Sequence, residues 1–267
     1  MEIKSCLSPD DWHYLEDNLP FSLNALNSLV HYPDRTQVYY SKSQREAIYV
    51  IEFKSGYNKH IWYSPIIWII SDIDDIDFLR NSLREQMNNN SSFIALARPF
   101  AENPDVSGIL TYREKLMVND KFEDLIIPEF KVVRLDESAA EQSLLLSIPS
   151  KKGNFTNEEI SRERLFIRER ETYGIFLDNR LVCRGSIMAE YGKYFSVGGF
   201  ITHTDYRKLG LATSLVGFIC KRIMEMGGIA TLTVRNDNVG ALSLYRKLGF
   251  MDTEEIMFLD WGSGVVP

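Results

Sequence analysis

The stretch Phe195-Ser-Val-Gly-Gly-Phe-Ile-Thr202, with the following turn Arg207-Lys-Leu-Gly210-Leu-Ala212, decides the fold of this chain. The first segment has the pattern of a β-strand, and its glycine pair predicts a bulge, since glycine weakens a regular strand. The second is a basic, glycine-containing turn that opens a helix. That helix carries an apolar stripe at four-residue spacing, formed by Leu211, Leu215, Ile219 and Ile223.

The residues after this helix predict a second strand and a second helix. Gly227-Gly228 should end the first helix, because glycine adopts the left-handed conformation common just beyond a helix end. Ile229 to Val234 is a short apolar, β-branched run, which favours a strand. The last helix is then expected to end at Gly249.

Upstream of Phe195, a strand is expected over residues 130–135, and two helices follow, one after Asp136 and one over residues 157–170. Two more strands flank Asp178-Asn179, a favourable hairpin turn, and residues 191–193 form a second turn. The second half thus reads strand, helix, helix, three antiparallel strands, helix, strand, helix, strand. This order predicts an α+β fold with a mixed, mostly antiparallel sheet flanked by helices.

The first half contains a similar mixture of helices and strands. The expected elements are helices from Ser8, over residues 21–30 and over residues 78–87, and strands over residues 37–40, 47–53, 60–70 and 93–97. The acidic run from Asp72 to Asp77 is interpreted as the start of the third helix, with a metal site as the less favoured reading. Val118 to Pro128 is the expected domain boundary.

Composition favours a folded, soluble protein. The chain has 267 residues, of which 45% are hydrophobic, enough for a substantial core. No charged leader with an apolar segment opens it, and its apolar runs are too short to span a bilayer. The three cysteines, Cys6, Cys183 and Cys220, form no C-x-x-C pair and indicate neither disulfides nor zinc. We therefore expect a cytoplasmic protein without a membrane partner.

The net charge of −7 is shared unevenly. Residues 131–267 hold 18 Lys and Arg against 17 Asp and Glu, whereas residues 1–130 hold 12 against 20. An acidic first half argues against nucleic acid as a partner, because neutralising phosphates supplies most of the non-specific affinity. The four histidines are dispersed and predict no metal site.

Three motifs resemble those of the GNAT-type N-acetyltransferases, in particular their glycine-N-acyltransferase-like branch. The turn from Arg207 to Ala212 resembles the R-x-x-G-x-G/A acyl-CoA signature of the family. Asn238-x-x-Ala241-x-x-x-Tyr245 and Tyr245-Arg-Lys-Leu-Gly249-Phe250 are similar to its closing motifs. The resemblance covers residues 130–260 well. It implies a catalytic GNAT domain over residues 126–267 and a degenerate GNAT-like domain over residues 1–125.

The resemblance implies acetyl-CoA as the acyl-donor substrate, with no metal. Successive backbone amides at a helix N-terminus suit the pyrophosphate, and two adjacent cations add charge. The strand before the turn is expected to pair with the pantetheine arm as an added strand would. The residues expected to bind the donor are Phe200, Ile201, Thr202, Arg207, Lys208, Leu209, Gly210, Leu211, Ala212, Thr213, Asn238, Ala241 and Tyr245.

Tyr245 is the expected proton donor to the departing thiolate, because a phenol stays protonated at neutral pH. For the base that deprotonates the amine, Glu190 is the first choice, with His203, Asp205 and a water relay as alternatives. The expected reaction is acetyl transfer to a primary amine by direct attack, on a small-molecule or peptide acceptor. A protein Nα- or lysine acetyltransferase and a non-catalytic acyl-CoA-binding module remain alternatives, and the sequence leaves the oligomeric state open.

Overall fold

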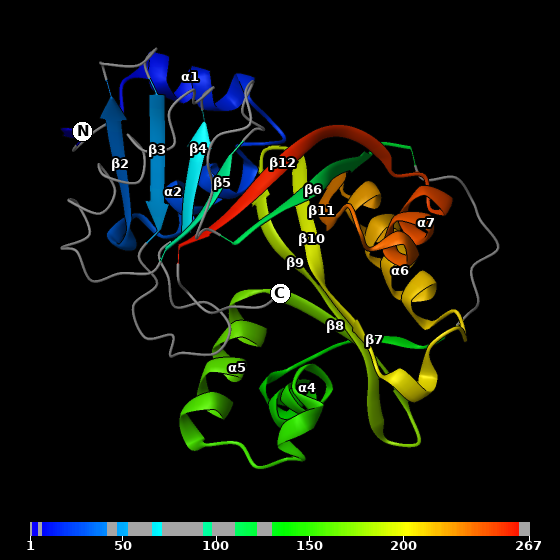
Figure 1. Cartoon of the computed structure of the whole chain (residues 1–267). Helices are drawn as coiled ribbons and strands as arrows, with labels where there is room; N and C mark the ends of the chain where they lie inside the picture. Colours follow the sequence, from blue (N-terminus) through cyan, green and yellow to red (C-terminus); the bar gives the residue numbers. More distant parts are fainter. Residues whose placement is uncertain are drawn as a thin grey trace. The chain divides into compact units, whose positions relative to one another are not determined.

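A computed structural model describes residues 2–4, 7–41, 47–52, 66–70, 93–97, 110–121 and 130–261 (Figure 1). The chain divides into two compact units. The first contains residues 1–116, 234–238 and 253–267, and the second contains residues 117–233 and 239–252. Strands β6 (Leu110–Asn119), β11 (Ile229–Arg235) and β12 (Met251–Trp261) therefore contribute residues to both units.

The first unit begins with β1 (Glu2–Lys4), α1 (Pro9–Asp17), α2 (Leu23–His31) and η1 (Pro33–Arg35). It continues with β2 (Thr36–Ser41), β3 (Ala47–Glu52), β4 (Ile66–Ile70) and β5 (Phe93–Ala97). Its strands follow the order β1-β2-β3-β4-β5-β12-β6, in which β4 and β5 are parallel. β12 pairs antiparallel with β5, from Met257 opposite Ala97 to Trp261 opposite Phe93.

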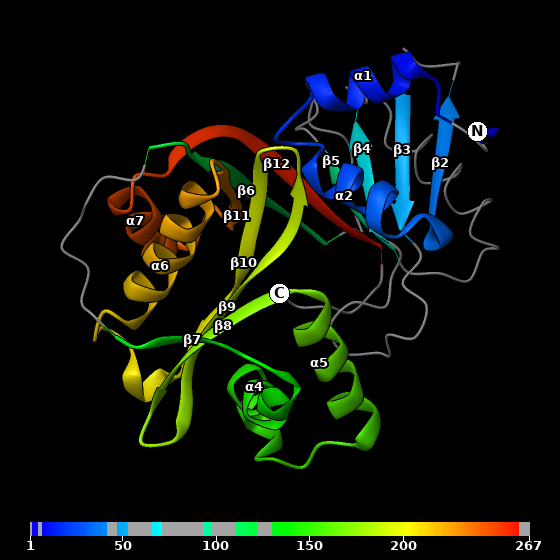
Figure 2. The same ribbon diagram turned by 180° about the vertical axis from the view of Figure 1, so that it is seen from behind.

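The second unit holds the elements expected to carry the site. They are β7 (Val132–Arg134), η2 (Glu137–Ala139), α4 (Ala140–Ser147), η3 (Pro149–Lys151), α5 (Asn157–Glu169), β8 (Glu171–Leu177), β9 (Arg180–Tyr191), β10 (Tyr194–Thr202), η4 (Thr204–Tyr206), α6 (Leu211–Glu225) and α7 (Val239–Lys247). The strand order is β11-β10-β9-β8-β7, and only β10 and β11 pair in parallel. Figures 1 and 2 show α4 and α5 on one side of β8 to β10, and α6 on the other.

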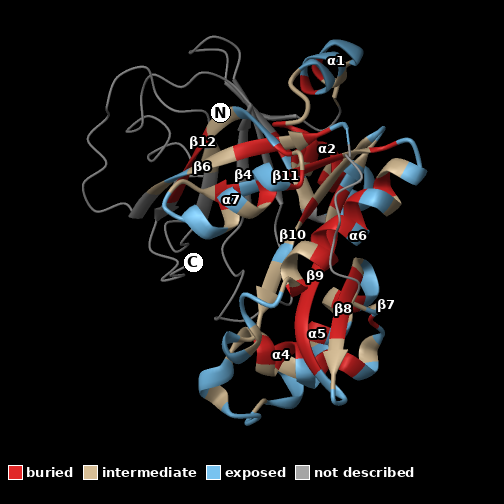
Figure 3. Ribbon diagram, turned by 90° about the vertical axis from the view of Figure 1, so that its right-hand side faces the viewer, coloured by how far each residue is buried: buried red, intermediate tan, exposed pale blue. Residues whose placement is uncertain are grey.

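The core of the second unit lies on both faces of this sheet. Strands β8 and β9 are buried along most of their length (Figure 3). On one face, the predicted stripe of α6 is fully buried, because its four members point at the sheet. On the other face, α4 and α5 pack around a cluster formed by Leu135, Ala139, Ala140, Leu146, Ile167 and Leu181.

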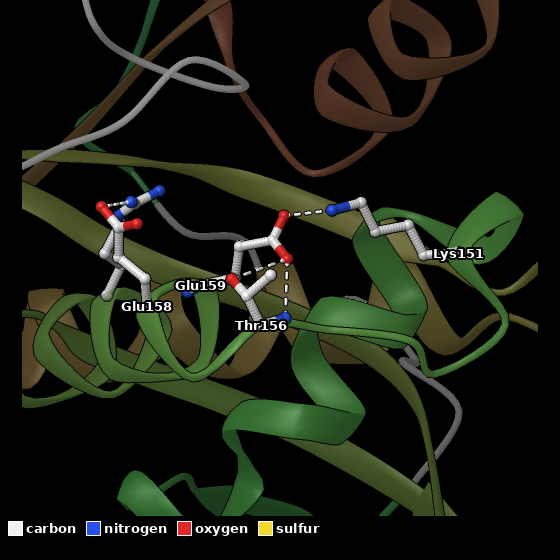
Figure 4. A network of polar contacts seen from close by, with 5 residues as sticks. Lys151, Thr156, Glu158 and Glu159 are labelled. Atoms are coloured by element: carbon white, nitrogen blue, oxygen red, sulfur yellow. Dashed lines mark hydrogen bonds and ion pairs between the residues drawn. The ribbon is translucent and has the colours of Figure 1, made fainter.

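Helix α5 is charged at most positions, yet its first turn is well defined. Thr156 and Glu159 form a capping box, in which Thr156 N donates to Glu159 Oε2 at 2.9 Å and Glu159 N donates to Thr156 Oγ1 at 3.2 Å. Lys151 pairs with the other oxygen of Glu159 (Figure 4). The hydrogen bonds from Lys151 and Thr156 lower the pKa of Glu159 to about 2.

Most of the expected elements are confirmed. The Asp178-Asn179 turn has positive φ at both residues, 48° and 62°, as a type I′ hairpin requires. β6 was not predicted, and Val118 and Asn119 of the expected boundary lie inside it. Only residues 66–70 of the strand expected over 60–70 are described, and the helix expected over 78–87, with the acidic run before it, lies outside the described residues.

Candidate active site

Strands β10 and β11 part from one another, and this parting creates the candidate site. They pair only through Tyr194 to Ser196, opposite Ile229 to Thr231. Within residues 130–261, no pairing between these strands is found beyond that point, although β10 runs on to Thr202. The Thr231 hydroxyl donates to the Phe195 carbonyl at 3.3 Å and adds a side-chain hydrogen bond to the paired part of the two strands. One backbone edge of β10 is therefore left for a ligand that can pair like a strand.

The predicted bulge in β10 is confirmed. The register with β9 shifts between Gly198 and Ile201, so that Gly199 and Phe200 face the single residue Gly185. Gly199 has φ of 64°, a left-handed conformation in which a side chain would be strained. The ring of Phe200 lies over β9 at Gly185, where an added Cβ would come within 2.2 Å of it. The bulge thus needs glycine on both strands.

The residues predicted for the pantetheine arm face opposite sides of the sheet. Ile201 packs against the cluster under α4 and α5, whereas the Phe200 ring lies 6.3 Å from that of Tyr245 on α7. Thr202 is fixed at the strand end by a 3.2 Å contact between its Oγ1 and Sγ of Cys183. Since their side chains are used for packing, these residues can offer a ligand mainly their backbone.

The basic turn leads directly into α6. Lys208 and Gly210 have positive φ, 63° and 88°, and Gly210 is the N-cap of the helix without a side chain to cap it. The first backbone N–H groups of α6 therefore find no acceptor in a cap side chain and need another one. Arg207 and Lys208 are exposed, and Arg207 Nε donates to the Thr202 carbonyl at 3.4 Å. Such a helix start, with two cations beside it, suits an anionic group.

The other residues predicted for the donor lie in this turn, in the first turn of α6, or at and just before the start of α7. Leu209 is 54% exposed, Leu211 is buried, and Ala212 and Thr213 are half-buried in the first turn of α6. Ala241 is half-buried in α7. Asn238 is exposed one residue before α7 and belongs to the first unit.

Tyr245 is almost completely buried, with 9% of its surface exposed. Its ring packs against those of Phe200 and Phe250, with centroids 6.3 and 5.8 Å away. Burial, together with the nearby Cys220 thiol, raises the pKa of the phenol to about 12. The phenol is therefore fully protonated at neutral pH and can donate a hydrogen bond, as an acid near a departing thiolate must.

The three residues considered as bases occupy different places. Glu190 is exposed on β9 opposite Phe195, at the end of the hairpin where β10 still pairs with β11. His203 lies just beyond Thr202, where its Nε2 is 2.6 Å from Nη2 of Arg180. Its Nδ1 accepts a hydrogen bond from the Asp205 backbone N–H at 3.3 Å. The exposed Asp205 has its carboxylate 3.8 Å from His203 Nδ1.

A group of polar residues under α4 and α5 was missed at the sequence level. Arg184 of β9, 6% exposed, donates from Nη2 to the Ser147 hydroxyl at 2.7 Å and lies 3.7 Å from Oε1 of Glu163. Glu163 is also buried, and Ser143 donates to it at 2.5 Å. The available signal was one arginine within the otherwise uncharged and mostly apolar run Leu181-Val-Cys-Arg-Gly-Ser-Ile187.

The described residues contain no group of three or more His, Cys, Asp or Glu arranged to hold a metal ion. Across the same part of the chain, every helix is too short or too polar to cross a membrane.

The mixed, mostly antiparallel sheet flanked by helices is the fold of acyl-CoA N-acyltransferases. Residues 139–250 match the family described as Acetyltransferase (GNAT) family, so the chain carries a GNAT acetyltransferase domain. The match spans the bulged strand, the basic turn, α6 and α7. No curated protein sequence matches the chain.

Solved structures share this fold over nearly the whole chain. A GCN5-related N-acetyltransferase-like protein from Streptococcus suis aligns with a TM-score of 0.59 and 16% identity, covering 94% of this chain and 97% of that one. A GNAT-family acetyltransferase from Colwellia psychrerythraea gives 0.56 and 13%, covering 97% and 99%. A GCN5-related N-acetyltransferase from Kribbella flavida gives 0.58 and 15%, covering 89% and 93%. At these identities the likeness concerns the fold.

Proposed function

We propose that this protein is an acyl-CoA-dependent N-acyltransferase that moves an acetyl group from acetyl-CoA to a primary amine. The observation that carries the proposal is the parting of β10 from β11 immediately before an uncapped, basic helix start. A coenzyme A ester needs a strand edge for its amide-bearing arm and a cradle of amides for its pyrophosphate. Here both occur in adjacent segments of one domain.

In this proposal, the pantetheine lies along β10 from Phe200 to Thr202, and the pyrophosphate lies over residues 207–213. This arrangement brings the thioester to the bulge at Gly199. A backbone amide released from the ladder by the bulge can then hold the thioester oxygen as negative charge develops on it. The side chains of Phe200 and Tyr245 close the site on the α6 side.

The reaction is direct transfer. The amine nitrogen attacks the thioester carbonyl carbon, a C–N bond forms, and the C–S bond breaks with its electron pair going to sulfur. The sulfur takes up one proton and the ammonium formed on nitrogen loses one. A phenol with a pKa near 12 is a weaker acid than a thiol, whose ordinary pKa is about 8.5, so Tyr245 is best placed to stabilise the thiolate by hydrogen bonding. Glu190 is proposed as the base, acting through water.

The test is thiol release from acetyl-CoA with a panel of amines. We expect turnover with at least one amine and a loss of at least tenfold in kcat for Tyr245→Phe. Tight binding of acetyl-CoA without turnover of any amine would instead support a non-catalytic acyl-CoA-binding module. Exclusive use of protein N-termini or lysines would support a protein acetyltransferase.

We also propose the division of labour between the halves. Residues 126–267 would form the catalytic domain, and residues 1–125 a degenerate GNAT-like domain that completes the fold. Removal of residues 1–125 should expose apolar surface and make the remainder insoluble. A soluble and fully active remainder would contradict this division.

A further inference from the structure

Strand β9 contains an extra residue beside the bulge of β10. Ala189 lies opposite Ser196, and the next pair along the ladder is Ile187 opposite Val197. Met188, between these two pairs, therefore has no residue opposite it in β10. A bulge re-aims the side chain of the extra residue, and bulges are over-represented next to active sites. Both strands of this pair are thus irregular at the same place.

The side chain of Met188 reaches the two glycines of β10. A Cβ built on Gly198 would be 3.3 Å from Cγ of Met188, and one built on Gly199 would be 3.9 Å from its Sδ. Ordinary contacts between carbon atoms are about 3.5–4.0 Å long. The space between the backbone of the glycine pair and Met188 is therefore about as deep as a methyl group. Met188 is only half-buried, so solvent reaches part of its side chain.

Met188 and the Phe200 ring lie on opposite sides of the bulge. A Cβ on Gly199 would also be 4.0 Å from Nη1 of Arg184, a side chain that is held by α4 and α5. Met188 therefore faces the side of the sheet that carries these helices. The other side is occupied by the Phe200 ring, which lies 6.3 Å from that of Tyr245. A group at the bulge that extends away from the Phe200 ring must extend towards Met188.

We propose that Met188 is a specificity-determining residue that restricts the acyl group of the donor to a short chain. The inference rests on the proposed N-acyltransferase function, in which the thioester lies at Gly199. The methyl group of an acetyl ester fits between the glycine backbone and Met188. The additional carbons of a butyryl ester would overlap Cγ and Sδ of Met188, and such overpacking is unfavourable.

The test is calorimetry on the complete chain with coenzyme A, acetyl-CoA and butyryl-CoA. We expect the wild type to bind acetyl-CoA at least tenfold more tightly than butyryl-CoA, which corresponds to about 1.4 kcal/mol. Met188→Ala removes Cγ, Sδ and Cε, and should raise the affinity for butyryl-CoA at least tenfold while the affinity for coenzyme A stays unchanged. Met188→Leu conserves the volume and should keep the wild-type preference.

Met224→Ala is the matched control for the substitution. It removes the same atoms from a half-buried methionine near the end of α6, far along that helix from the basic turn. This variant should also keep the wild-type preference.

Gly198→Ala tests the same space from the other strand. Gly198 has no positive φ, so alanine suits its backbone. Its methyl group would occupy the space assigned to the acetyl group. The affinity for acetyl-CoA should therefore fall at least tenfold, while the affinity for coenzyme A, which has no acyl group, should not change.

The wild-type comparison of acetyl-CoA with butyryl-CoA does not depend on a variant that folds. Equal affinities in the wild type, or an unchanged ratio in Met188→Ala, would overturn the inference and leave the proposed function standing. If Met188→Ala changed the preferred amine in turnover but not the preferred acyl group, Met188 would line the acceptor site and the inference would be wrong. Absence of binding by coenzyme A and both esters would overturn the proposed function and this inference together.

Discussion

Replacing Gly185 by alanine should displace the ring that shapes the candidate slot. A Cβ at this position would lie 2.2 Å from Cδ1 and 2.4 Å from Cε1 of Phe200. Carbon atoms pack best at about 3.5–4.0 Å, so the ring must move by roughly 1.3 Å. Overpacking a buried site costs about 1–3 kcal/mol, while alanine in place of glycine in a strand returns about 0.5–1 kcal/mol. We expect a net loss of about 1–2 kcal/mol.

The displacement should also weaken acetyl-CoA binding, because Phe200 belongs to the bulge itself. Urea unfolding measures the loss of stability, and calorimetry measures the affinity for acetyl-CoA. Gly174→Ala is the matched control, since its Cβ would come within 2.5 Å of Leu181 in the same sheet, away from the slot. This control should lose stability but retain affinity.

A double variant isolates the contact. Phe200→Leu removes the ring, so Gly185→Ala should cost clearly less in that background than in the wild type, giving a coupling of at least 0.5 kcal/mol. If Gly185→Ala unfolds at the wild-type urea concentration and binds acetyl-CoA equally well, the ring does not define the slot. Strict additivity of the two changes would lead to the same conclusion.

Three further predictions concern the turn, the capping box and the phenol. Gly210→Glu should abolish acetyl-CoA binding by calorimetry, because it places strain and negative charge at the start of α6, whereas Gly227→Glu, with the same strain at the other end, should bind normally. The pKa of Glu159 is about 2 in the folded protein, against an ordinary value of 4.5. Its hydrogen bonds therefore contribute stability that is complete above pH 4.5 and is lost as the pH falls towards 2. Glu159→Gln should make the melting temperature depend less on pH in that window. Tyr245→Phe should lower kcat without lowering the melting temperature by more than a few degrees, and a parallel loss of both would indicate a packing role.

Local patterns were sufficient to predict the elements around the candidate site. The α6 stripe has one periodicity and one buried face, and Asp178-Asn179 has the residues that tolerate positive φ. The bulge was predicted because two adjacent glycines in a strand have few other uses. In each case the decisive interaction lies within a few residues of sequence.

Long-range pairing could not be predicted in the same way. β6 was missed because Arg113-Glu-Lys115 interrupts its apolar pattern, and Arg113 is satisfied by Glu255, which is distant in the sequence. The pairing of β12 with β5 likewise joins segments from opposite ends of the chain. Arg184 was missed for a related reason, since its partners Ser147 and Glu163 come from two helices.

The cost of burying Arg184 gives a last prediction, which concerns the structural role of its pairing with Glu163. A buried ion pair is often no more stable than apolar residues of similar size, and its replacement is frequently neutral or stabilising by about 1–4 kcal/mol. Arg184→Met combined with Glu163→Leu should therefore keep or raise the free energy of unfolding in urea, while Arg184→Met alone should lower it by leaving Glu163 buried without its cation. If both variants are destabilised by the same amount, the pair holds α5 on the sheet.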